Sequence, residues 1–131
     1  MLRAGLAILA LTVLAGGGLA IYEAARLRAD RIWASELTGG DPAHGPRLMT
    51  LHGCAGCHEI PGVPGADGRV GPPLRGLAER IYIAGVLPNK PANLIRWVRA
   101  AREVDPRSAM PSTGMSESEA RDVAAYLYSL R

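Results

Sequence analysis

The amino-acid sequence predicts an all-α domain with long loops, preceded by a membrane-directed N-terminal helix. Residues 4–22 carry no charge, two later segments repeat apolar residues every three or four positions, and no segment alternates convincingly like a strand. The chain has 131 residues, 48% of them apolar, which allows one small domain and an accessory segment. The net charge of only +3 is too mild to indicate nucleic-acid binding.

Residues 1–22 predict a membrane anchor or a secretory signal. The uncharged run is long enough to cross a bilayer as a helix, and it exceeds the apolar core of an ordinary signal peptide. Gly18 and Ala20 have the small-residue spacing that a signal peptidase accepts, so cleavage stays an alternative. Arginines follow the run and only Arg3 precedes it, so charge does not settle the orientation.

The remaining chain divides into a helical stalk, residues 23–40, and a folded domain, residues 41–131. Glycines and a proline after Thr38 end the stalk helix. Within the domain we expect a short helix over 44–53, a glycine- and proline-rich loop over 54–77, and a helix over 91–104. We expect a last helix over 116–130. Ser116 and Glu119 match a capping box at its start.

The motif that carries chemistry is Cys54-Ala55-Gly56-Cys57-His58, because C-x-x-C-H is the attachment sequence of c-type haem. Each thiol can add to one vinyl group of a single porphyrin, and the adjacent imidazole then lies under the iron. A thioredoxin-like dithiol would need a βαβ context, and a structural zinc site would need four ligands. A disulfide across so short a loop would be strained and would leave His58 unexplained.

A second axial ligand would close the iron and suit it to electron transfer. The candidates are Met49, Met110, Met115, His44 and His52. Met49 and both histidines are tethered on the proximal side of the ring, which favours a packing or surface role. We predict Met110, which lies in a loop free to reach the opposite face, with Met115 as the alternative.

From these residues onward the sequence resembles the class I monohaem cytochromes c, over residues 41–131. The matching blocks are Gly45 with Leu48, the Cys54–His58 motif, residues 71–74, and Met110 followed by residues 125–127. The resemblance implies three to five short helices wrapped around one haem c. It also implies that the Pro72 carbonyl accepts a hydrogen bond from His58, and that Gly45 lies at a close crossing of the first and last helices.

Residues 82–97 look most like cytochrome c domains that are attached to terminal oxidases or serve them. In those relatives the equivalents of Tyr82, Asn89 and Trp97 lie beside the haem propionates, where buried carboxylates need donors. Arg75 or Arg80 could add a charge-assisted bond. A role of Trp97 in the core alone is the alternative. Lys90 replaces the hydroxyl residue that commonly precedes Pro91, which weakens a helix cap.

The resulting functional hypothesis is a one-electron carrier, not an enzyme, that passes electrons from a quinol-oxidising complex to a terminal oxidase without a small-molecule substrate. We expect the cytochrome domain on the periplasmic side of the inner membrane, because bacteria attach haem to this motif outside the cytoplasm. The alternatives are a fixed haem subunit of a larger membrane oxidoreductase, and a haem sensor or peroxidase in which Met110 is absent from the iron.

Overall fold

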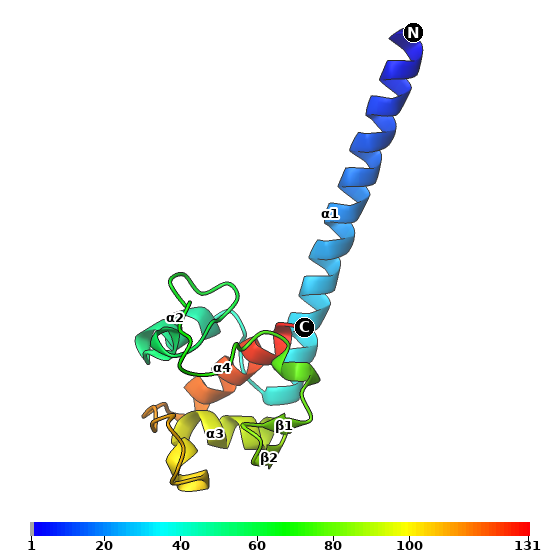
Figure 1. Ribbon diagram of the computed structural model, residues 1–131. Helices are drawn as coiled ribbons and strands as arrows, with labels where there is room; N and C mark the ends of the chain where they lie inside the picture. Colours follow the sequence, from blue (N-terminus) through cyan, green and yellow to red (C-terminus); the bar gives the residue numbers. More distant parts are fainter. Residues whose placement is uncertain (1) are drawn as a thin grey trace.

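A computed structural model describes residues 2–131, and the side chains of residues 11–131. In this part of the chain four α-helices form the framework: α1 (Leu2–Thr38), α2 (Gly45–Leu51), α3 (Pro91–Val104) and α4 (Glu117–Ser129). Helix α1 projects away from the domain, and α4 lies between the end of α1, α2 and α3 (Figure 1). The expected all-α arrangement therefore holds for the main elements.

The N-terminal part is one continuous helix, so the expected anchor and stalk are not separated by a break. Among residues 11–131, no helix is long and apolar enough to cross a membrane. The expected span of residues 4–22 lies partly outside this range, because the side chains of residues 4–10 are not described.

The last turns of α1 belong to the packed domain. Ala34 is fully buried in the same core cluster as α4, and Thr38 is also buried. The Trp33 ring meets the Tyr128 ring edge-on with 6.1 Å between centroids, and the Arg131 guanidinium lies 4.6 Å from the Trp33 ring centroid. The stalk expected over residues 23–40 thus ends as a packed element before residue 41.

Helix α4 is the centre of the core. Its start has the predicted capping box, since the Ser116 hydroxyl accepts from the Glu119 amide and the Glu119 carboxylate accepts from the Ser116 amide. All residues from Val123 to Ser129 are buried. Tyr126 explains the glycine of α2, because a Cβ at Gly45 would lie 2.2 Å from the Tyr126 Cβ. The predicted crossing of the first and last domain helices is confirmed.

Helix α3 has the predicted bounds, with Pro91 in its first turn. Lys90 occupies the N-cap position and makes no side-chain capping bond, as expected from its chemistry. The backbone at Ala100 is not helical, so α3 is kinked at that residue.

The expectation that no strand forms was wrong. Strands β1 (Tyr82–Ile83) and β2 (Leu87–Pro88) pair antiparallel, with Ile83 opposite Leu87. Residues Ala84 and Gly85 both have positive φ in the connecting turn, at 50° and 72°. The connection has three residues, 84–86, and the Val86 amide closes it by donating to the Ile83 carbonyl at 2.9 Å. Three-residue connections of this kind are common in hairpins. Two residues per strand are too few for an alternating pattern to be visible in the sequence.

Candidate haem site

The cysteine motif follows α2 as a short 3-10 helix, η1 (Cys54–Gly56). The amides of Cys57 and His58 both donate to the Cys54 carbonyl, at 3.2 and 3.0 Å. This compact turn presents two free, half-buried thiols and places the imidazole directly after them. Burial raises the pKa of the Cys54 thiol, so the thiol stays protonated to higher pH than an exposed cysteine.

The His58 ring is held by a backbone carbonyl. Its Nδ1 lies 2.7 Å from the Pro72 oxygen. Because a carbonyl only accepts, Nδ1 carries the hydrogen and Nε2 keeps a lone pair for a metal. The bond implied by the family resemblance is therefore present.

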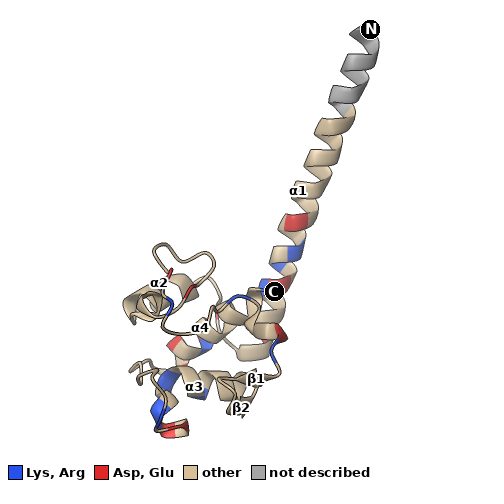
Figure 2. Ribbon diagram, viewed as in Figure 1, with Lys and Arg blue, Asp and Glu red and all other residues tan. Residues whose placement is uncertain are grey.

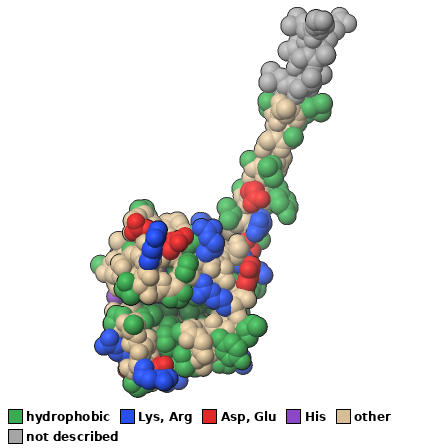
Figure 3. Space-filling view, in the orientation of Figure 1, with side chains coloured by type: hydrophobic (Ala, Val, Ile, Leu, Met, Phe, Trp, Pro, Cys, Tyr) green, Lys and Arg blue, Asp and Glu red, His purple; other side chains and the backbone are tan. Residues whose placement is uncertain are grey.

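The backbone at Gly71 passes close to the His58 ring. A Cβ at Gly71 would lie 2.3 Å from His58 Cε1, and the Gly71 amide donates to the Cys57 carbonyl at 2.7 Å. Two thiols, an oriented imidazole and a glycine cradle together fit a covalently attached haem. Hydrophobic side chains gather in a hollow between the part that contains α2 and the part that contains α3 (Figure 3).

The loop after α3 carries both candidate methionines. Met110 is half-buried and packs against the core cluster, whereas Met115 is only 4% exposed and belongs to that cluster. Thr113 fastens the loop to α3: its amide donates to the Arg99 carbonyl at 3.1 Å and its hydroxyl to the Val98 carbonyl at 2.9 Å. The loop is thus fixed on the α3 side, three residues after Met110.

The other ligand candidates have different surroundings. Met49 is 1% exposed, inside the core on α2. His44 Nδ1 lies 2.9 Å from an Asp122 carboxylate oxygen. His52 Nδ1 lies 3.1 Å from the Thr113 carbonyl oxygen. Each of these side chains therefore has a packing or hydrogen-bonding role within the protein.

The three residues expected near the propionates are not alike. Trp97 is buried in the core, and Tyr82 is 56% exposed on β1. The Asn89 amide group donates to the carbonyls of Leu77 and Arg80, each at 2.8 Å. Both of its N–H groups have carbonyl partners, and a bond from Asn89 to a propionate stays a prediction. The Arg80 guanidinium likewise donates to the carbonyls of Pro73 and Arg75.

Sequence reasoning missed the partner of Asn89. The Tyr128 hydroxyl donates to the Asn89 side-chain oxygen at 2.7 Å, which links α4 to the hairpin. Burial raises the pKa of Tyr128 to about 12. The sequence showed only an asparagine at this position. Tertiary packing decides which groups it bonds.

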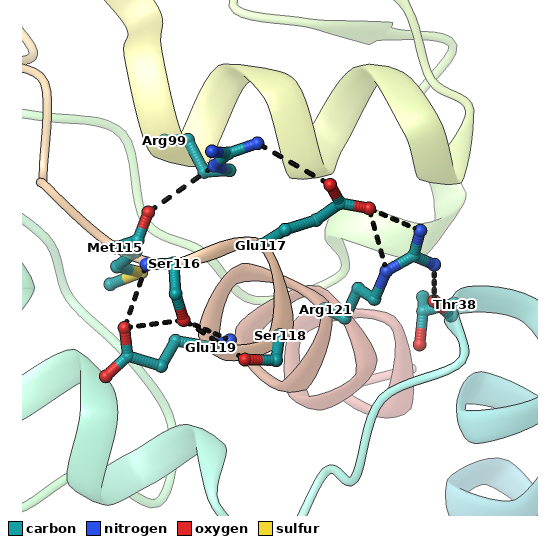
Figure 4. Close-up of polar contacts among 8 residues, drawn as sticks. All are labelled: Thr38, Arg99, Met115, Ser116, Glu117, Ser118, Glu119 and Arg121. Carbon is teal, nitrogen blue, oxygen red and sulfur yellow. Dashed lines mark hydrogen bonds and ion pairs between the residues drawn. The ribbon is translucent and has the colours of Figure 1, made fainter.

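Charged side chains connect the first turns of α4 with α3. The Glu117 carboxylate lies between two guanidiniums, 2.6 Å from Arg121 and 3.9 Å from Arg99 (Figure 4). The bond from Arg121 lowers the pKa of Glu117. Basic and acidic residues are interspersed along the end of α1, whereas α3 carries three arginines, Arg96, Arg99 and Arg102, and one acidic residue, Glu103 (Figure 2).

The comparison with known protein families agrees with this geometry. The family model described as Cytochrome c matches residues 42–131. No individual curated protein matches the chain. The matched range contains the cysteine motif, Pro72, the methionine loop and α4, and members of the family bind covalently attached haem c. The chain belongs to the cytochrome c family, and Cys54 and Cys57 are its haem-attaching cysteines.

Proposed function

We propose that the protein carries single electrons from a quinol-oxidising complex to a terminal oxidase, with His58 and Met110 as the two axial ligands. The observation that carries this proposal is the 2.7 Å bond from His58 Nδ1 to the Pro72 carbonyl, which leaves Nε2 free on one side. The half-buried Met110, held in a loop of its own, supports ligation from the opposite side.

The bound haem would supply reversible one-electron chemistry at its iron. The protein's part is to keep both ligands still: the Pro72 carbonyl fixes the His58 ring, and Thr113 fixes the loop that carries Met110. The apolar core around α4 excludes water. Fixed ligands and a dry interior lower the reorganisation that accompanies electron exchange, and no proton needs to move.

The ligand assignment is tested by the near-infrared band that arises from a sulfur-to-ferric-iron transition. We expect Met110→Ala to abolish this band. Met115→Ala is the matched control, because Met115 is a buried core residue of the same loop, and this variant should keep the band while losing thermal stability. A band that survives in Met110→Ala and disappears in Met115→Ala would transfer the role to Met115.

A sensor or peroxidase is distinguished from a carrier by access to the iron. Two protein ligands close both axial positions, so the reduced wild-type protein should bind carbon monoxide slowly. Fast binding by the wild type would instead indicate an open distal position and would support the sensor or peroxidase function.

We further propose that residues 1–22 hold the protein at the inner membrane, with the cytochrome domain on the periplasmic side. The uncharged run of residues 4–22 supports this placement, as do the exposed apolar side chains of α1, among them Leu14 and Ile21. Intact mass of protein extracted from native membranes tests it. The full mass plus one haem is expected, whereas loss of residues 1–20 would show a cleaved signal.

A fixed haem subunit is the second candidate function, and the packing of α1 favours it. Ala34, Trp33 and Thr38 pack against the domain, so α1 cannot act as a flexible tether at that end. A rigid junction suits a subunit whose helix lies among others, because it would fix the haem at one height. Co-purification of a stable multi-subunit complex after mild detergent extraction would support this function, and isolation as a single chain would favour the carrier.

A further inference from the structure

His52 connects the two sides of the haem site. It lies directly after α2, at the C-cap, two residues before Cys54, and its side chain is only 16% exposed. Its Nδ1 lies 3.1 Å from the carbonyl oxygen of Thr113, which is distant in sequence and belongs to the methionine loop. Since the carbonyl only accepts, Nδ1 is the donor.

The other ring nitrogen, Nε2, does not compete with Nδ1 in setting the orientation of the His52 ring. His52 Nε2 is buried without a hydrogen-bond partner among the described residues. The nearest carboxylate oxygen, of Glu119, is 3.7 Å away and beyond hydrogen-bond distance. That oxygen is Oε1, whereas the other oxygen of the same carboxylate, Oε2, accepts from Ser116 in the capping box of α4. The bond to Thr113 is therefore the directional contact that orients the ring.

Thr113 is the point at which the methionine loop is fastened. Its amide and hydroxyl donate to α3, and its hydroxyl also accepts from the Met115 amide at 3.3 Å. Its carbonyl receives the His52 donor. Thr113 thus joins three parts of the domain: α3, the chain that leads into α4, and the segment that leads into the cysteine motif.

We propose that His52 is a positioning residue for Met110: its Nδ1–H holds the Thr113 carbonyl, and through it the loop, so that Met110 stays on the iron. This inference rests on the proposed ligation by Met110. It assigns His52 a role on the methionine side of the haem, although the residue lies in sequence beside the cysteines. Loss of the donor should raise the fraction of time for which the methionine is away from the iron.

The experiment measures carbon monoxide binding by the reduced holoprotein, in which the methionine must leave before the gas can bind. A net hydrogen bond of ordinary strength predicts that His52→Leu binds carbon monoxide about fivefold faster than the wild type. His52→Asn should restore a rate near that of the wild type, because the asparagine amide places a donor close to the Nδ1 position. Rescue by Asn separates the hydrogen bond from mere filling of space.

His44→Leu is the matched control. His44 immediately precedes the same helix and bonds Asp122 of α4 instead of the methionine loop, so its loss should leave the carbon monoxide rate unchanged. Nitrogen-15 spectra of the wild type provide a measurement that needs no variant: the His52 Nδ1–H should exchange slowly with solvent. Fast exchange of that hydrogen, or a wild-type rate in a folded His52→Leu protein, would overturn the inference.

The outcomes separate this inference from the ligand assignment. If Met110→Ala leaves the near-infrared band intact, the proposed ligation itself is wrong. If Met110→Ala abolishes the band but His52→Leu and the wild type bind carbon monoxide at equal rates, only the role of His52 is wrong.

Discussion

Single atoms decide how the proximal ligand is held. His58 has the Pro72 carbonyl on one side and the α-carbon of Gly71 close to its ring, so both the tautomer and the ring position follow from backbone atoms. The motif alone identified His58, and the resemblance implied the Pro72 bond. The need for glycine at position 71 could not be predicted, because it depends on how closely the backbone there passes the His58 ring.

Gly71→Ala should therefore disturb haem incorporation. The new Cβ would lie 2.3 Å from His58 Cε1, and backbone or ring must shift to admit it. We expect less haem-loaded protein per chain and a lower reduction potential in the fraction that forms, measured by the pyridine haemochrome assay and redox titration. Gly56→Ala, inside the motif but with no atom within 4 Å of the added Cβ, should load haem normally.

Tyr128 makes the stability of the fold depend on pH in the alkaline range. Its pKa is raised by burial to about 12 from the ordinary value of 10.0, so the neutral phenol is the form that the folded state favours. This contribution to stability is complete below pH 10 and is lost as the pH rises through about 12. Melting temperature should fall over that interval in the wild type. In Tyr128→Phe it should be lower at neutral pH but decline less steeply; equal declines would contradict the assignment.

Asn89 marks the limit of residue-level prediction. Asparagine in a family-like segment suggested a propionate donor, yet its amide hydrogens bond two carbonyls and its oxygen accepts from Tyr128. The residue type was compatible with either role. The carbonyls that lie within hydrogen-bond distance of Asn89 depend on how α4 packs on the hairpin. The residues next to Asn89 in the sequence do not predict that packing.

At the level of elements, the sequence predicted helices best where periodicity and end signals agree. The bounds of α3 were as predicted, and α4 begins at its capping box. The hairpin was missed because its strands are short, and the bend at Ala100 has no local signal such as glycine or proline.

Ser116→Ala tests the start of α4. The Ser116 hydroxyl satisfies the Glu119 amide, so its removal should cost about 1 kcal/mol of unfolding free energy. For a domain of this size that is roughly 5 °C in melting temperature. Ser118→Ala, two residues after the N-cap, should change the melting temperature by less. Equal effects of the two variants would show that the cap contributes nothing specific.

Gly45→Ala tests the crossing of α2 and α4. An alanine Cβ would overlap the Tyr126 Cβ, and separation of the helices should cost roughly 1–3 kcal/mol. Chemical denaturation of the holoprotein measures this loss. In the double variant Gly45→Ala, Tyr126→Gly the Cβ and Cγ atoms that the new alanine would meet are both absent. A loss simply equal to the sum of the two single variants would argue against a direct clash.

For the whole molecule, the important feature is the junction between α1 and the domain. The connections that hold it include the Trp33–Tyr128 ring contact, the Arg131 guanidinium over Trp33, and an Arg131–Asp30 ion pair at 3.9 Å. The sequence placed a boundary at residue 41 because glycine and proline end the helix there. That signal marks where the helix stops, whereas the packing begins several residues earlier.

Trp33→Ala should loosen this junction. Removing the ring frees both Tyr128 and Arg131 of their contact, so trypsin should cut faster after Arg28 and Arg31 in the holoprotein. Ile32→Ala, a neighbour that is 50% exposed, is the control and should be cut at the wild-type rate. Unchanged cleavage in Trp33→Ala would mean that α1 is not fixed by these rings.

A redox titration of the holoprotein, followed by carbon monoxide addition to the reduced form, tests the central claim most directly. We predict one reversible one-electron transition and only slow carbon monoxide binding, because His58 and Met110 occupy both axial positions. A wild-type protein that binds the gas as fast as it is mixed would contradict the account, since its iron would have an open side and its purpose would not be electron transfer alone.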